Sequence, residues 1–142
     1  MDLLDDIKYK FDRLGYIKKL IEEWKPINCE TEKDYENSLY NFLHLNLPNT
    51  QITKQFAKGR IKADIVIDEK YIVELKNKLN SRNNYQRLIG QLFEYKKWEG
   101  SIILLLIGEV DQNFIKEIKS FIKNEDNSFL TEDPKYILIE KK

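Results

Sequence analysis

Two acidic residues and a lysine have a spacing that can build a hydrolytic site. Nine residues separate Asp64 from Glu74, and Lys76 follows Glu74 by two positions. The run 68–70 lies between two apolar stretches and predicts a β-hairpin whose centre, Glu69, would place Asp64 opposite Glu74. Opposed side chains on one face have Cβ atoms about 5 Å apart, and residues two apart on a strand point the same way. Three ionisable groups should therefore converge on one face.

The apolar surroundings of these groups favour a cation site. Burying carboxylates is costly unless a partner neutralises them. A divalent cation is such a partner, since two carboxylates supply the hard oxygen ligands that magnesium prefers while it keeps waters at its other positions. The plainer alternatives are that Asp64 and Glu74 lie at exposed strand ends, or that Lys76 forms an ordinary salt bridge with one of them.

This pattern resembles the signature of the PD-(D/E)XK nuclease superfamily. The resemblance rests on Asp64, the nine residues after it and Glu74-Leu75-Lys76, and it covers roughly residues 31–107. Ala63 stands where the named motif has proline, which weakens the recognition more than the chemistry. The resemblance implies a restriction-endonuclease-like αβββαβ core. It also implies hydrolysis of DNA phosphodiester bonds by a magnesium-activated water, with manganese able to substitute and RNA open as a substrate.

The resemblance also implies roles for these residues. Asp64 and Glu74 would bind one or two magnesium ions, with the Leu75 carbonyl as a further ligand. Lys76 would orient or deprotonate the water, or stabilise the phosphate in the transition state, and the sequence does not separate these roles. Glu36, on the preceding helix, matches a catalytic and metal-facing glutamate of many members. Its alternative is an exposed helix acid.

A second motif lies on the helix after Lys76. Residues 91–95 resemble the Gln-x-x-x-Tyr motif of the RecB-like branch of the superfamily. Because residues four apart share a helical face, Gln91 and Tyr95 can both address the site as catalytic residues. The alternative is that the two residues lie at the polar edge of an amphipathic helix and have no role in catalysis.

Basic residues gather in two stretches of a chain whose formal net charge is zero. Residues 51–63 and 75–87 each carry four Lys or Arg residues and no acid, whereas acids collect at Asp2, Asp5 and Asp6 and over residues 109–133. Each stretch alone reads most simply as solvated surface, but together they predict a local phosphate-binding face. The predicted nucleic-acid contacts are Lys58, Arg60, Lys62, Lys78, Arg82 and Arg87.

The elements that would position these residues follow from the periodicity of apolar residues. Helical spacing over residues 3–24 predicts one broken helix or two short ones before Pro26. Thr31 and Asp34 form a capping-box pattern that begins a helix ending at Pro48. Further segments follow in the order strand (51–56), strand (62–67), strand (71–76), helix (82–98), strand (101–107), helix (114–122) and strand (136–139).

This order predicts an α/β fold with a mixed central sheet flanked by helices. The continuous apolar run 101–107 fits a strand covered on both faces. We expect a single domain over residues 1–142, made of an N-terminal helical extension (1–28), the core (31–107) and a C-terminal helix and strand (110–142).

Composition excludes several other kinds of site. The single cysteine, Cys29, excludes an intrachain disulfide and a cysteine-rich metal site, and the single histidine, His44, leaves a histidine-based site unsupported. No apolar run is long enough to span a membrane and the first residues lack a signal-peptide pattern, so we expect a cytoplasmic or intracellular protein.

Three functional hypotheses remain open on the sequence. The leading one is an active nuclease, with a homodimer expected because cutting two strands needs two sites. The second is a catalytically inactive nuclease-fold module that binds nucleic acid or a protein partner. The third is a structural α/β interaction protein whose acids and lysine align by chance.

Overall fold

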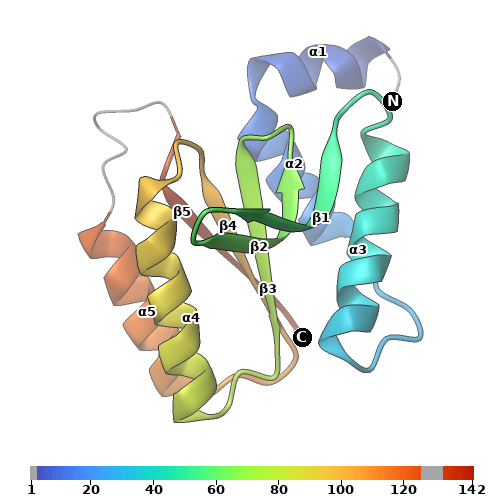
Figure 1. Ribbon diagram of the computed structural model, residues 1–142. Coiled ribbons are helices and arrows are strands. Elements are labelled where there is room, and N and C mark those ends of the chain that lie inside the picture. The colour runs from blue at the N-terminus through green and yellow to red at the C-terminus, as the bar shows by residue number, and fades with distance from the viewer. Residues whose placement is uncertain (1–2, 126–132) are drawn as a thin grey trace.

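A strand that is apolar on both faces needs cover on both sides, and this requirement organises the molecule. The computed structural model describes residues 3–125 and 133–142, and in it β4 (Ile102–Ile107) is buried along its whole length. One face of the sheet packs against the three N-terminal helices and the other against the later helices (Figure 1). The first group is α1 (Leu3–Phe11), α2 (Arg13–Glu23) and α3 (Glu32–Asn46). The second is α4 (Arg82–Glu94), the short 3-10 helix η1 (Tyr95–Lys97) and α5 (Gln112–Asn124).

The strands form one open, mixed sheet in the order β1-β2-β3-β4-β5. The other four are β1 (Ile52–Lys58), β2 (Ile61–Ile67), β3 (Tyr71–Asn77) and β5 (Tyr136–Lys141). Neighbours are antiparallel from β1 to β3 and parallel from β3 to β5. The predicted α/β class, element order and helix-flanked mixed sheet are confirmed. The helix expected over 82–98 ends earlier, because its last turn tightens into η1.

The hairpin of β2 and β3 has the register predicted from its turn. Ile65 pairs with Val73 and Ile67 with Tyr71, which centres the hairpin on Glu69. The ladder ends at the Ile65–Val73 pair. Asp64 and Glu74 therefore lie where the two strands part, and β2 continues in a different direction from β3 (Figure 1).

Helix α3 is fixed at its first residue and against the end of β3. Thr31 Oγ1 accepts a hydrogen bond from the Asp34 amide, and Asp34 Oδ2 accepts one from the Thr31 amide, as the capping-box pattern predicts. Glu32 Oε1 accepts a hydrogen bond of 2.9 Å from the backbone amide of Asn77. These bonds determine where Glu36, one helical turn further on, meets the sheet.

The N-terminal helical segment is part of the same core as α3. Ile17 and Ile21 of α2 are fully buried, and Trp24 lies beside them and donates its indole N–H to Ser38 of α3. Within residues 3–125 and 133–142, no helix has both the length and the apolar content needed to cross a membrane.

Thr31→Ala should destabilise the protein by about 1 kcal/mol, because the first turn of α3 loses its side-chain acceptor. Thr31→Ser keeps a hydroxyl in the same place and should retain most of that free energy. Urea unfolding measured by circular dichroism checks the difference. Equal losses in the two variants would contradict a role for the hydroxyl.

Candidate active site

The candidate site lies in the gap that opens between β2 and β3. Asp64 Oδ2 accepts a 2.8 Å hydrogen bond from the backbone amide of Leu75, so this side chain replaces a backbone acceptor of β2. The Asp64 and Glu74 carboxyl groups lie close enough for each to shift the pKa of the other. The separated strands thus bring two carboxyl groups together.

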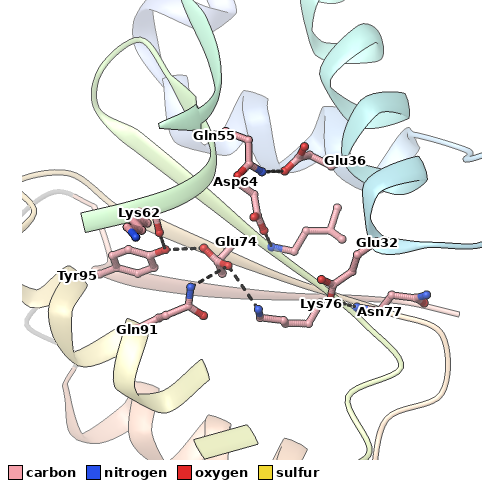
Figure 2. A network of polar contacts seen from close by, with 11 residues as sticks. Glu32, Glu36, Gln55, Lys62, Asp64, Glu74, Lys76, Asn77, Gln91 and Tyr95 are labelled. Atoms are coloured by element: carbon pink, nitrogen blue, oxygen red, sulfur yellow. Dashed lines mark hydrogen bonds and ion pairs between the residues drawn. The ribbon is translucent and has the colours of Figure 1, made fainter. Parts of the chain in front are cut away.

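Glu74 is the most enclosed member of the site, with a residue exposure of 1%. Gln91 of α4 donates from Nε2 to Glu74 Oε1 at 3.4 Å, and Lys76 Nζ lies 3.7 Å from the same oxygen. Tyr95 of η1 reaches Oε2 (Figure 2). The structure therefore brings together five of the predicted catalytic residues: Asp64, Glu74, Lys76, Gln91 and Tyr95.

The contacts of the Tyr95 hydroxyl indicate the protonation state of Glu74. Its oxygen lies 2.6 Å from the Lys62 carbonyl oxygen and 2.5 Å from Glu74 Oε2. A phenol has one proton to donate, whereas a carbonyl can only accept. Ionised Glu74 would compete with Lys62 for that proton. A protonated Glu74 can donate to Tyr95 while Tyr95 donates to Lys62, so both contacts are satisfied.

Electrostatics favour the same state. Burial, and after it the neighbouring Asp64 carboxylate, raise the pKa of Glu74 from its ordinary value of 4.5 to about 8. A hydrogen bond donated by Tyr95 to Glu74 would favour the charged form, as the Lys76 ammonium does, but the two together offset only part of this pKa shift. Burial also raises the pKa of Asp64, against the hydrogen bond from Leu75. Burial and the Glu74 charge raise the pKa of Tyr95, which keeps the phenol neutral.

Glu36 lies on the side of Asp64 away from Glu74. It is buried, so the alternative that it is an exposed acid on the helix surface is wrong. Its exposure is 4%, and its charge is one of the causes that raise the pKa of Asp64. Lys33 Nζ lies 2.9 Å from Oε2, and Gln55 donates to Oε1. Both carboxylate oxygens are therefore engaged, and the role of Glu36 as a metal ligand stays a prediction. A small pocket is lined by Glu32, Lys33, Glu36, Gln55, Asp64 and Leu75.

Gln55 lies at the site although no sequence motif indicates it. It lies between the paired residues of β1 and β2 at the position facing Asp64, and its φ of 51° interrupts the ladder there. The sequence feature that could have indicated Gln55 is Gly59, which predicts a turn. A two-residue turn at 59–60 sets the register of β1 on β2 and so places residue 55 opposite residue 64.

The predicted nucleic-acid contacts do not form one surface. Arg60 and Lys62 line a pocket beside Glu74, together with Gly90, Gln91, Glu94 and Tyr95. The other four are more dispersed. Lys58 lines a groove with Trp98, Lys78 and Arg87 are exposed, and Arg82 pairs with Glu117 at 3.3 Å.

The donor set fits a hard divalent cation built around two carboxyl groups. Asp64 and Glu74 are in contact and costly to ionise together, which is the condition that a cation relieves. Gln91 Oε1 is buried and lacks a hydrogen-bond partner in the described chain. Among residues 3–125 and 133–142, no three Asp, Glu, His or Cys side chains converge as a ligand group. Further ligands would thus have to be amide, carbonyl or water oxygens.

Comparisons with protein-family models, with curated proteins and with solved structures found no match for this chain.

In buffer containing EDTA, the free energy of unfolding should fall between pH 5 and pH 8. The folded protein keeps the Glu74 proton up to about pH 8, whereas the unfolded chain releases it near 4.5. Each pH unit in this window should therefore cost about 1.4 kcal/mol. Glu74→Gln, which keeps an N–H to donate to Tyr95, should flatten the slope and be the more stable protein at pH 8. Urea titrations at several pH values test this, and parallel slopes would contradict a raised pKa.

Tyr95→Phe should destabilise the protein by about 1–3 kcal/mol, because it leaves the Lys62 carbonyl and Glu74 without their shared partner. Tyr136→Phe is the matched control, since that buried hydroxyl makes a single 2.8 Å bond to the Leu92 carbonyl. The effect of Tyr95→Phe should shrink in a Glu74→Gln background, as a double-mutant cycle measures. Strict additivity would show that Tyr95 and Glu74 act independently.

Proposed function

We propose that this protein is a metal-dependent nuclease that hydrolyses phosphodiester bonds of DNA, with a restriction-endonuclease-like core of the PD-(D/E)XK type. One observation carries the proposal. The carboxyl groups of Asp64 and Glu74 meet where a hairpin opens, and the ammonium group of Lys76 lies 3.7 Å from Glu74. The residues that support the sequence resemblance are thus the ones that share the site.

Packing alone gives no reason for this arrangement. Glu74 is buried in a sheet whose neighbouring positions are apolar, and its pKa is raised because the protein solvates its charge poorly. Replacing buried ionic groups by apolar residues of similar size is often neutral or stabilising. A structural role therefore does not account for two carboxyl groups and a lysine at one position.

Asp64 and Glu74 would hold the magnesium ion, with the Gln91 side-chain oxygen and the Leu75 carbonyl as further oxygens beside them. Magnesium supplies a water of lowered pKa and neutralises charge on the phosphate. Tyr95 and Gln91 orient the Glu74 carboxyl group, one at each oxygen. Lys76 is partly exposed and holds its positive charge at the edge of the site, where it can orient the attacking water or stabilise the phosphate.

The substrate would approach from the side of β2 and α4. Arg60 and Lys62 line the pocket that contains Gln91 and Tyr95, so two positive side chains flank the candidate site and outnumber the one acid of the pocket, Glu94. Such contacts bind phosphates and supply affinity without reading base sequence. The pocket therefore supports a substrate recognised through its backbone.

One observation favours the second candidate function, an inactive nuclease-fold module that binds nucleic acid or a protein partner. Glu74 has hydrogen-bonding or ionic partners at both oxygens: Gln91 and Lys76 at Oε1, and Tyr95 at Oε2. This network is closed by protein groups alone. A protein with these contacts and no cleavage activity would retain the fold and the basic pocket.

The deciding experiment compares cleavage of supercoiled plasmid and of a labelled single-stranded oligonucleotide in magnesium, in manganese and in EDTA. Asp64→Ala and Lys76→Ala should each lower the rate by at least about a hundredfold, because each removes a group that acts on the reacting phosphate or water. Asp68→Ala and Lys70→Ala, on the same hairpin but outside the site, serve as matched controls and should cleave normally.

The outcomes separate the candidates. Cleavage that requires metal and is lost in both site variants supports the nuclease. Binding of either nucleic acid without cleavage by the parent protein supports the module. Cleavage that persists in Asp64→Ala would overturn the assigned site.

A further inference from the structure

Helix α1 carries an apolar stripe that the described chain does not cover. Leu3, Leu4, Ile7 and Phe11 are 76%, 59%, 44% and 87% exposed. At about 100° of rotation per residue, these four side chains fall within roughly one third of the helix circumference. Tyr9, on the opposite side, is 6% exposed and packs toward α2. The stripe therefore points away from the rest of the molecule, and α1 lies at one end of the fold, at the top of the view (Figure 1).

This concentration of exposed apolar side chains differs from those elsewhere on the surface. Among the described residues, the other large exposed apolar side chains are those of Ile27 in the loop before α3, Leu45 of α3 and Phe93 of α4. Isolated exposed apolar residues are ordinary in a folded protein, whereas a continuous stripe marks an interaction surface.

The charges on α1 identify the kind of partner. Asp5 and Asp6 lie in its first turn and Lys8 and Lys10 in its last, so the helix is acidic at one end and basic at the other. Asp6 and Lys10 are one helical turn apart and border the same side of the stripe. Their midpoint, residue 8, lies next to Ile7 at the centre of the stripe. A second α1 related by a two-fold axis at this point would set Asp6 against Lys10 of the other copy, and Leu4 near its Phe11.

We infer that α1 is a homodimer interface in which two copies of the helix pack antiparallel across a two-fold axis. An isologous contact needs a surface that is complementary to itself, and this helix has an apolar centre and ends of opposite charge. A lipid surface fits less well, because membrane-surface helices carry mostly Lys and Arg on the polar face. The inference does not depend on the proposed nuclease function.

The size of the contact sets the expected strength. Two nine-residue helices bury less than the roughly 1,200–2,000 Å² of a standard protein interface. The dimer should therefore be weak and should form progressively as the protein concentration rises.

Sedimentation velocity of the full chain over a wide concentration range tests the inference through charge reversal. Asp6→Lys and Lys10→Asp each turn two attractions into repulsions, and each should raise the dimer dissociation constant at least about tenfold. An equimolar mixture of the two variants should dimerise like the parent protein, because every reversed charge then meets its opposite. Lys19→Glu, an exposed reversal on α2, is the control and should leave the dissociation constant unchanged.

Circular dichroism and urea midpoints confirm that each variant is folded before its association is compared. A parent protein that stays monomeric at every concentration overturns the inference. The inference is also overturned if the mixture of the two variants stays as monomeric as each variant alone, or if the single charge reversals leave the dimer dissociation constant unchanged. Monomer that co-sediments with phosphatidylcholine–phosphatidylglycerol vesicles, and loses this binding in Phe11→Glu, would assign the stripe to a lipid surface instead.

Discussion

The constraint on which the site depends is the burial of the Glu74 carboxyl group beside that of Asp64. Two adjacent carboxyl groups in a poorly solvated place cannot both ionise cheaply. The pKa of each is raised, and Glu74 is surrounded by the hydroxyl of Tyr95, the amide of Gln91 and the ammonium of Lys76. These neighbouring polar groups allow the two carboxyl groups to remain buried in the fold.

The open end of the β2–β3 hairpin creates the space for them. Where the ladder stops after Ile65 and Val73, the Asp64 side chain takes over a strand amide and the Tyr95 hydroxyl reaches the Lys62 carbonyl. Backbone groups that strand pairing would have satisfied are thus satisfied by side chains of the site. A site built in this way is coupled to the fold, because moving either strand changes the hydrogen bonding of the reactive groups.

The two sides of the site differ in character. The pocket beside α3 is lined by Glu32, Glu36 and Asp64 as well as Lys33, whereas the pocket beside α4 carries Arg60 and Lys62 as well as Glu94. The proposed metal ligands lie between the two pockets, since Asp64 lines the first and Gln91 the second. The α1 stripe is a separate feature, whose charge pattern concerns association and not the chemistry of the site.

The sequence alone determined the element order, the mixed sheet, the capping box and the hairpin register, because these follow from local periodicity and turn chemistry. The same register placed Asp64 next to Glu74, and helical spacing placed Gln91 near Tyr95. Only the tertiary structure decided that Glu36 is buried with both oxygens engaged, that Gln55 faces Asp64, and that Arg82 pairs with Glu117. Those contacts join elements distant in the chain, so their geometry depends on how helices pack on the sheet, and local patterns carry no information about it.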